Sequence, residues 1–385
     1  MIDVIIPVYG GVDQTRRCID SVLAERQAAP HEVVVIDDAS PEPAITGYLD
    51  GLARQGRISL HRNEFNLGFV RSVNRGMALH GDRDVVLLNS DTEVANHWLD
   101  RLQAAACSAP RIATATPFSN NATICSYPFE GWSGGVPGTL GLAQLDRLFA
   151  MANAGRTLEL PTAIGFCMYI RRACLDQLGL FDAERFGRGY GEENDFCMRA
   201  LKSGWRHVLA ADMFLYHEGS VSFSDERFEL IKAATTALLA AHPDYTSRVH
   251  EFIKADPAAE LRAAVDNARV AFGPEEARHV LAEHAEERRR LVNSMWEIDR
   301  LTAERETLAG QVNQLNYAVD HAMNVLADRD RMIAEHEELI AQLRAGLAHA
   351  ESLAFSRQAE LDALRSNLLI RLYERVRRRL ARSAP

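Results

Sequence analysis

The stretch VVLLNSDTEV, residues 85–94, joins four branched apolar side chains directly to a cluster of polar and acidic ones. A short apolar run bounded by polar residues predicts a β-strand covered on both faces. A carboxylate just after such a strand lies at the edge where open α/β sheets bind ligands. Ser, Asp and Thr are also common helix caps, so on this stretch alone a capped helix after the strand is the simpler interpretation.

The composition of the chain is that of an ordinary globular protein. It has 385 residues, of which 47% are hydrophobic and 25% charged, and this length suggests two or three domains. The net charge of −10 argues against a general nucleic-acid binder, so we expect no nucleic-acid partner. The six cysteines form no CxxC pair, and most lie in apolar stretches. We therefore expect reduced core thiols rather than disulfides or a zinc site.

Up to about residue 245, short β-rich runs alternate with helical segments. The runs are IDVIIPV, HEVVVID, RISLHRN, DVVLLN and RIATATP. This alternation predicts βαβ units and a mostly parallel sheet, with the strand ends and the loops after them at one edge. Residues 117–138, rich in Asn, Ser, Gly and Pro, interrupt the pattern and predict a long loop, of the kind that is usually functional or mobile.

From Leu291 onward, apolar residues recur every seven positions. The first series is Leu291, Ile298, Arg305, Val312, Val319, Leu326, Ile333, Ile340, Leu347, Ala354, Leu361 and Leu368, and a weaker second series runs three residues further on. Two such series over many heptads predict a coiled coil. Because β-branched residues fall in the first series and leucines in the second, a parallel homodimer is favoured. A helical hairpin is the second alternative, and a solvated single helix is another.

The last residues, NLLIRLYERVRRRLARSAP (367–385), form a basic amphipathic pattern. The predicted apolar face holds Leu369, Leu372, Tyr373, Val376 and Leu380, and six arginines surround it against the single Glu374. Such a helix suits an anionic membrane surface. A solvated helix end, whose arginines favour the helix dipole, is the alternative. No signal peptide or apolar stretch of about 18 residues is visible, so we expect a cytoplasmic protein, peripheral at the inner face of the membrane.

Candidate ligand-binding residues, most of them polar, stand at the ends of four successive predicted strands. They are Pro7, Val8 and Tyr9 at the end of the first, Asp37, Asp38 and Ser40 at the end of the second, Asn66 and Gly68 after the third, and Asn89, Ser90 and Asp91 after the fourth. Each group alone is typical of a helix cap. Together, at one edge of a sheet, they predict a nucleotide site.

These residues carry a resemblance to the family 2 glycosyltransferases of the GT-A fold, inverting enzymes that use nucleotide-sugar donors. The matching pieces, in the family's order over residues 2 to about 223, are IPVYG, VIDDAS, NLGFVRSVNRG, LLNSDTEV, GLFDAERFGRGYGEENDFCMRALKSGW and YHEGSVSF. The resemblance implies a three-layer GT-A sandwich with a mostly parallel sheet over residues 1–245. A helical linker (246–285), a long α-helical coiled coil (286–365) and the basic tail (366–385) would follow.

The resemblance implies a divalent metal, Mn²⁺ or Mg²⁺, held by Asp91. The family's DxD motif reads Asn89-Ser90-Asp91 in this chain, so Asn89 replaces the first carboxylate and could instead bind the sugar or ribose. His217 in YHEGS stands where related enzymes place a metal-binding histidine. Its imidazole would suit Mn²⁺ somewhat better than Mg²⁺. A lone histidine after a strand is otherwise more often structural.

The acceptor hydroxyl needs a base, and YGEENDFCMRA offers Glu192, Glu193 and Asp195 at a helix start. Acids in a first turn also stabilise the helix dipole. Three neighbouring acids repel one another, which would raise at least one pKa toward a useful value. The family pattern, Glu-Asp-x-Asp, assigns the base to Glu193, with Glu192 as the substitute. Asp195 would be a structural or acceptor-positioning acid.

For the nucleobase and ribose, the resemblance points to Pro7, Val8, Tyr9 and Asp38, with Ser90 beside Asn89. A carboxylate at position 38 could accept a hydrogen bond from the N3–H of uracil or thymine, which favours UDP- or dTDP-sugars. Arg71 could reach the base or the phosphates, and a solvated helix arginine is an equal expectation.

The sequence therefore predicts an inverting, metal-dependent glycosyltransferase. It would move a hexosyl or deoxyhexosyl group to a glycan or lipid-linked acceptor in polysaccharide biosynthesis. With Asn89 in place of the first acid of the DxD motif, the chain resembles rhamnosyltransferase-like members of the family, which is a weak indication that the donor is dTDP-rhamnose. A sugar nucleotidyltransferase is less favoured, because IPVYGGVDQTRR lacks a convincing glycine-rich phosphate loop. The third alternative is a catalytically weakened GT-A domain on a coiled-coil scaffold, which the Asn89 and Glu193 departures support.

Overall fold

The computed structural model describes residues 1–219, 225–327 and 333–366, in two compact units, 1–285 and 286–385. Its strands are β1 (Ile2–Val8), β2 (His31–Asp37), β3 (Ser59–Arg62), β4 (Asp84–Leu88), β5 (Thr92–Glu93), β6 (Ile112–Ser119), β7 (Thr157–Leu160), β8 (Cys167–Ile170) and β9 (Arg206–His217). Its helices are α1 (Val12–Ala24), α2 (Pro43–Arg54), α3 (Phe69–Met77), α4 (Trp98–Ala106), α5 (Gly141–Ala152), α6 (Arg172–Leu178), α7 (Ala183–Phe186), α8 (Glu192–Lys202), α9 (Asp225–Ala241), α10 (Tyr245–Ala255), α11 (Ala259–Phe272), α12 (Pro274–Ala327) and α13 (Ile333–Ser366), with a 3₁₀ turn η1 (Thr123–Cys125).

The first unit is built on one mixed sheet in the order β3-β2-β1-β4-β8-β6-β9-β5, with β7 paired to β9. β3, β2, β1 and β4 are parallel, as the sequence predicts. β8 lies antiparallel between β4 and β6, while β6 and β9 are parallel. β5 and β7 pair antiparallel with β9. The sheet is therefore parallel in its first half and mixed in its second.

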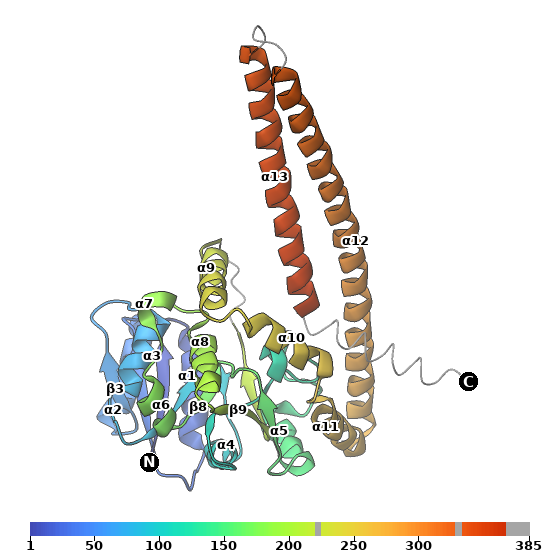
Figure 1. Cartoon of the computed structure of the whole chain (residues 1–385). Coiled ribbons are helices and arrows are strands. Elements are labelled where there is room, and N and C mark those ends of the chain that lie inside the picture. The colour runs from blue at the N-terminus through green and yellow to red at the C-terminus, as the bar shows by residue number, and fades with distance from the viewer. Residues whose placement is uncertain (220–224, 328–332, 367–385) are drawn as a thin grey trace. The chain divides into compact units, whose positions relative to one another are not determined.

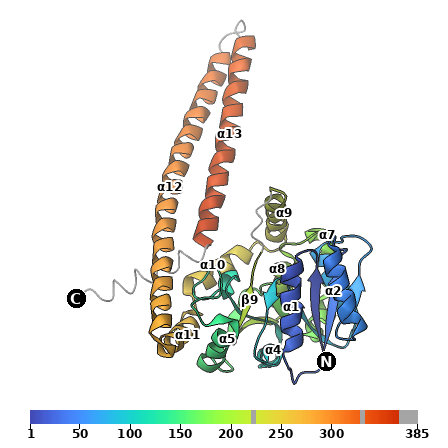
Figure 2. The same cartoon turned by 180° about the vertical axis from the view of Figure 1, so that it is seen from behind.

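Both faces of the sheet are covered, which explains the nearly continuous apolar runs of its strands (Figures 1 and 2). Ile5, Val34 and Leu87 belong to one core cluster with residues of α3, α6 and α8. Their chain neighbours Val4 and Val35 are equally buried. Because successive strand side chains point to opposite faces, these neighbours fill a second layer on the other side. The three-layer α/β sandwich is thereby confirmed.

The segment 246–285, predicted as a linker, packs as part of the first unit. The Arg269 side chain on α11 is fully buried. Its guanidinium contacts Glu276 at 2.9 Å and Glu283 at 2.6 Å, both on α12, and donates to the hydroxyl of Tyr127 at 3.1 Å. A buried charge of this kind needs paired partners. The start of α12 is thus fixed, through Tyr127, to the long segment that follows β6.

In the second unit, α12 and α13 lie side by side and run antiparallel (Figure 1). Glu304 contacts Arg357 at 3.1 Å, and Arg305 donates to Gln358 at 3.0 Å. The predicted heptad positions that the structure describes, among them Leu301 and Leu361, are buried or half-buried. The apolar series is therefore covered within one chain, in the hairpin arrangement. The parallel homodimer stays a prediction.

None of the described helices is long and apolar enough to cross a membrane. The predicted basic amphipathic face at residues 367–385 lies outside the described residues.

Candidate active site

Two adjoining cavities open at the carboxyl ends of β1, β2 and β4. The first, of about 740 Å³, is lined by residues that include Pro7, Val8, Tyr9, Asp38, Asn66, Asn89, Ser90 and Asp91. The second, of about 850 Å³, is lined by residues that include Asn121, Phe166, Tyr190, Glu192, Glu193 and His217. Both are lined by Phe69, Asn89, Asp91, Arg188, Glu218 and Gly219. Asn89 and Asp91 therefore lie where the cavities meet.

A tight turn after β4 presents Asn89 and Asp91 to the cavities. The backbone N–H of Thr92 donates to the carbonyl of Asn89 at 3.2 Å, and the Thr92 hydroxyl donates to the same carbonyl at 2.7 Å. The backbone N–H of Asn89 donates to the carbonyl of Phe166 at 2.9 Å. These bonds explain why polar residues follow the strand without being a helix cap, since the chain enters β5 rather than a helix.

Register places His217 beside Asp91. Thr92 pairs with His217 across the antiparallel β5–β9 ladder, and the backbone N–H of Glu218 donates to the carbonyl of Asp91 at 2.9 Å. The His217 ring stacks on Phe166, with centroids 5.2 Å apart. Its Nδ1 lies 2.7 Å from the carbonyl of Asn121. A carbonyl can only accept, so Nδ1 carries a proton and Nε2 is the nitrogen left to face Asp91.

The donor atoms of Asp91 and His217 fit a divalent cation. His217 Nε2 lies 3.5 Å from Asp91 Oδ1. Burial acts to raise the pKa of Asp91, but the contact with His217 and the backbone N–H groups of Asp91 and Gly219 together hold that pKa below its ordinary value. The carboxylate is therefore ionised at neutral pH. An oriented imidazole, whose other nitrogen is bonded to a carbonyl, next to a carboxylate is a common metal-ligand pair.

The carboxylate of Asp38 is buried and already bonded to protein groups. It accepts from Asn63 Nδ2 at 2.6 Å and from the backbone N–H groups of Leu67 and Gly68, both at 2.8 Å. It therefore shapes the loop before α3. Asp38 also lines the first cavity. A direct contact between its carboxylate and a nucleobase is a proposal. The neighbouring Asp37 bonds Ser40 and Arg62 and lines neither cavity.

Glu192 and Glu193 begin α8 and line the second cavity. The helix starts after Gly191, whose φ of 89° is a left-handed conformation that favours glycine. Burial raises the pKa of Glu192 well above its ordinary value, and repulsion from Glu193 raises it further. Burial also raises the pKa of Glu193, although backbone N–H groups at the helix start oppose it. Two adjacent acids with raised pKa values are a typical source of a general base.

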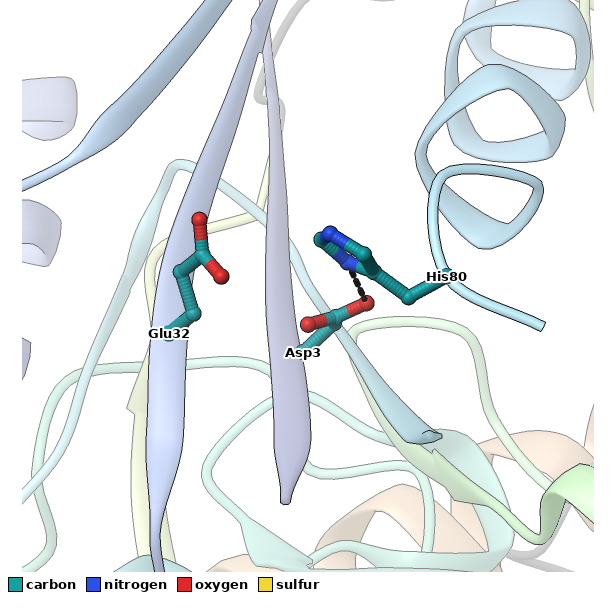
Figure 3. A group of neighbouring side chains, drawn as sticks. All are labelled: Asp3, Glu32 and His80. Carbon is teal, nitrogen blue, oxygen red and sulfur yellow. Dashed lines mark hydrogen bonds and ion pairs between the residues drawn. The ribbon is translucent and has the colours of Figure 1, made fainter. Parts of the chain in front are cut away.

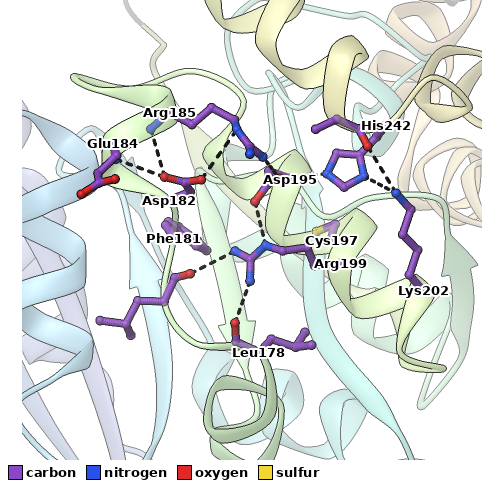
Figure 4. A network of polar contacts seen from close by, with 12 residues as sticks. Leu178, Phe181, Asp182, Glu184, Arg185, Asp195, Cys197, Arg199, Lys202 and His242 are labelled. Carbon is purple, nitrogen blue, oxygen red and sulfur yellow. Dashed lines mark hydrogen bonds and ion pairs between the residues drawn. The ribbon is translucent and has the colours of Figure 1, made fainter.

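Asp195 lines neither cavity, so its predicted acceptor-positioning role has no support, and its contacts are structural. It accepts from Arg199 Nε at 2.7 Å and lies 2.8 Å from His242 Nε2 (Figure 4). His242 Nδ1 lies 2.8 Å from the Lys202 ammonium, which can only donate, so Nε2 carries the proton given to Asp195. This network joins α8 to the end of α9 and so supports the helix that carries Glu193.

Replacing Asp195 by alanine should lower the free energy of unfolding by about 3 kcal/mol, because it leaves buried donors unpaired. Urea denaturation followed by circular dichroism measures this. Asp176→Ala, at an exposed site on α6, is the matched control and should change stability by less than about 0.5 kcal/mol. Equal stability of the two variants would show that the network contributes nothing.

The positions of two arginines differ from those expected from the sequence. Arg71 is exposed on α3 and lines neither cavity, so the structure does not place it at the predicted donor site. The buried face of α3 carries Val70, Ser72 and Val73, and Arg71 points away from them. Arg188, which the sequence analysis missed, lines both cavities. Its only signal in the sequence is the run GRGYG, residues 187–191.

A separate group of potential ligands lies at the opposite edge of the sheet (Figure 3). Among the described residues, Asp3, Glu32 and His80 bring three such side chains together, near the amino ends of β1 and β2. Arg83 Nη1 contacts Asp3 at 2.8 Å and Glu32 at 2.6 Å. The single positive charge of Arg83 therefore already offsets part of the charge of the two carboxylates.

Part of this chain matches a known protein family. Residues 3–179 match the family model described as glycosyl transferase family 2. An uncharacterized protein of Sinorhizobium fredii, y4gI, is 24% identical over 284 residues, which cover 69% of this chain and 29% of that protein. The chain thus spans less than a third of that relative's length.

Three of the solved structures that are similar to this chain are the following. GalNAc-T7 with UDP, GalNAc and Mn²⁺ is 18% identical, with a TM-score of 0.47, covering 69% of this chain and 54% of that one. The mannosyltransferase PcManGT of Pyrobaculum calidifontis, with GDP-Man and Mn²⁺, is 17% identical, with a TM-score of 0.44, covering 74% and 79%. TarS of S. aureus is 17% identical, with a TM-score of 0.42, covering 66% and 43%. Residues 3–179 thus match the glycosyl transferase family 2 model, and the unit that contains them has the mixed α/β sheet typical of the GT-A fold.

Proposed function

We propose that this protein is an inverting, metal-dependent glycosyltransferase that uses a UDP- or dTDP-sugar. The observation that carries the proposal is the pair formed by Asp91 Oδ1 and His217 Nε2, 3.5 Å apart at the junction of two cavities. A transfer between two substrates needs such a junction, because the reacting atoms must meet while each substrate keeps its own site.

The first cavity suits the nucleotide. Tyr9, more than half exposed, offers a ring to a base, and Asp38 lies in the same wall. A divalent ion, Mn²⁺ or Mg²⁺, held by Asp91 and His217 would neutralise negative charge on the leaving diphosphate. Asn89, which lines both cavities, offers an uncharged amide to the sugar or ribose, with Ser90 beside it.

The second cavity suits the acceptor. Glu193 takes the proton of the acceptor hydroxyl. At the same time the oxygen of that hydroxyl forms a bond to the anomeric carbon, from the face opposite the leaving group. The bond from that carbon to the phosphate oxygen breaks with its electron pair, and a nucleoside diphosphate leaves. Configuration at the anomeric carbon is inverted. The acceptor proposed is a glycan or a lipid-linked glycan in polysaccharide biosynthesis.

Thermal-shift measurements with a panel of nucleotide sugars, with and without Mn²⁺, test the proposal. A ligand that binds only the native state raises its melting temperature. We expect UDP- or dTDP-sugars to do so and Mn²⁺ to enlarge the shift, with dTDP-rhamnose a specific candidate. A chain that responds to no nucleotide sugar would instead support a scaffold with a weakened catalytic domain.

The pH dependence should reveal the buried acids. A base must be ionised to act, and burial raises the pKa of Glu193 above its ordinary value of 4.5. We therefore expect kcat/KM to fall as the pH falls, with a midpoint above pH 4.5. Initial rates over a pH series measure this, with circular dichroism as the control for folding. Activity that stays constant down to the ordinary pKa would contradict the assignment.

The C-terminal part is proposed to assemble and localise the enzyme. A parallel homodimer through the heptads would require the hairpin of α12 and α13 to open, so that a second copy covers the same residues. A contact of residues 366–385 with an anionic membrane, at the inner face, would bring the active site near a lipid-linked acceptor. Light scattering of the full chain measures the first. Pelleting with anionic vesicles, compared with a chain ending at Asn367, measures the second, and equal recovery would remove it.

A further inference from the structure

Arg188 is distinguished by its charge. Among the described residues that line the two cavities, it is the sole arginine or lysine. The acids that line the first cavity are Asp38, Asp91 and Glu218. The acids that line the second cavity are Asp91, Glu192, Glu193 and Glu218. An anion entering either cavity therefore meets several carboxylates and one guanidinium from this part of the chain.

At the cavity junction, a positively charged side chain would help to offset the negative charge of a bound diphosphate. The diphosphate of a nucleotide sugar is a dianion and gains negative charge as the sugar leaves. Of the two cavity residues that follow β4 on either side of Ser90, Asp91 is charged and Asn89 is neutral, so only one carboxylate there would hold a divalent ion. A guanidinium binds phosphate oxygens through two parallel hydrogen bonds. Arg188 is the group in the described walls that offers this.

The backbone of Arg188 is held beside Gly68 and Phe69, in the lining of both cavities. The backbone N–H of Phe69 donates to the carbonyl of Arg188 at 3.2 Å. A Cβ on Gly68 would lie 2.9 Å from the Cα of Arg188, so only glycine allows this close approach. Arg188 Nη2 donates to Asn66 Oδ1 at 3.1 Å, which holds the side chain over the loop that Asp38 organises.

We propose that Arg188 binds the diphosphate of the donor and shares the charge of the leaving group with the divalent ion. This inference rests on the proposed function. It implies that part of the affinity for a nucleoside diphosphate does not depend on the metal. It also implies that this part requires a guanidinium at position 188.

Calorimetric titration of UDP, dTDP, uridine and thymidine tests the inference, in Mn²⁺ and in EDTA. Arg188→Ala should weaken binding of the matching diphosphate about 10- to 100-fold in both conditions, the loss of a charge-assisted hydrogen-bond pair. Affinity for the nucleoside should not change. Arg188→Lys keeps the charge without the planar fork and should lie between the two. Arg26→Ala is the control, at an exposed site just beyond α1, at the other end from Gly11 and Gln14.

Three results would overturn the inference. Arg188→Ala could bind the diphosphate as tightly as the parent chain. It could lose the nucleoside equally, which would mean that residue 188 supports the whole cavity rather than the phosphates. The parent chain could bind neither diphosphate even with Mn²⁺, while Arg26→Ala behaves in the same way. This last result alone would also reject the proposed function, so the two failures are distinguishable.

Discussion

Asp91→Ala is expected to lower sugar transfer at least about 100-fold, because the site loses its one charged metal ligand after β4. The fold should survive the change, since the contact that joins this turn to β9 is made by the backbone carbonyl of Asp91. Release of nucleoside diphosphate in the presence of Mn²⁺ measures the loss. EDTA should have the same effect on the parent chain, and added Mn²⁺ should restore its activity but not that of the variant.

The matched control is Asp82→Ala, an exposed acid just before the start of β4, at the other end of the strand. It should keep parental activity and metal dependence. If Asp91→Ala were as active as Asp82→Ala, the metal site would have to lie elsewhere, and the proposed role of the cavity junction would be wrong.

Glu193→Gln is expected to lower kcat about 10²- to 10⁴-fold, the usual contribution of a general base. Glutamine keeps the size and polarity of the side chain but cannot take a proton. Donor affinity should not change, because Glu193 lines the second cavity and not the first. Glu192→Gln should cost less, since Glu193 is the proposed base and Glu192 its substitute.

Glu184→Gln, an exposed acid on α7, is the control for the loss of a negative charge near α8. Steady-state kinetics with separate titration of donor and acceptor separates kcat from KM. If kcat fell in Glu192→Gln but not in Glu193→Gln, Glu192 would be the base instead of Glu193. Retained activity in both variants would mean that neither is the base.

Much of the lining of the first cavity could be predicted because strand ends are a local property of the sequence. Pro7–Tyr9, Asp38 and Asn89–Asp91 each follow an apolar run, and parallel strands bring their carboxyl ends to one edge. The order of the second half of the sheet could not be predicted in this way. β8 enters antiparallel between β4 and β6, a pairing across about 80 residues of chain that no local pattern records.

The rest of the site depends on contacts far apart in the chain. His217 meets Asp91 only through the β5–β9 register, so the family resemblance was the signal that pointed to it. Arg188 can be recognised as a residue of the site only from the folded structure, in which its loop packs against Gly68. Asp195 illustrates a local rule that does apply: residues two apart on a helix face different directions. Since Glu193 faces the cavity, Asp195 turns into the structural network.

The heptad pattern predicted which residues of α12 and α13 are buried, but not what covers them. A seven-residue repeat requires a partner helix, and either a second copy or the same chain can supply it. In the structure, the polar interruptions Arg305 and Arg357 contact residues of the opposite helix, which stabilises the hairpin register.

Diffraction from crystals grown with Mn²⁺ and a nucleoside diphosphate, recorded to give the anomalous signal of manganese, tests the central claim most directly. We expect one strong peak within ligand distance of Asp91 Oδ1 and His217 Nε2, with the nucleoside beside Asp38. A peak at Asp3, Glu32 and His80, with none at the cavity junction, would contradict the account.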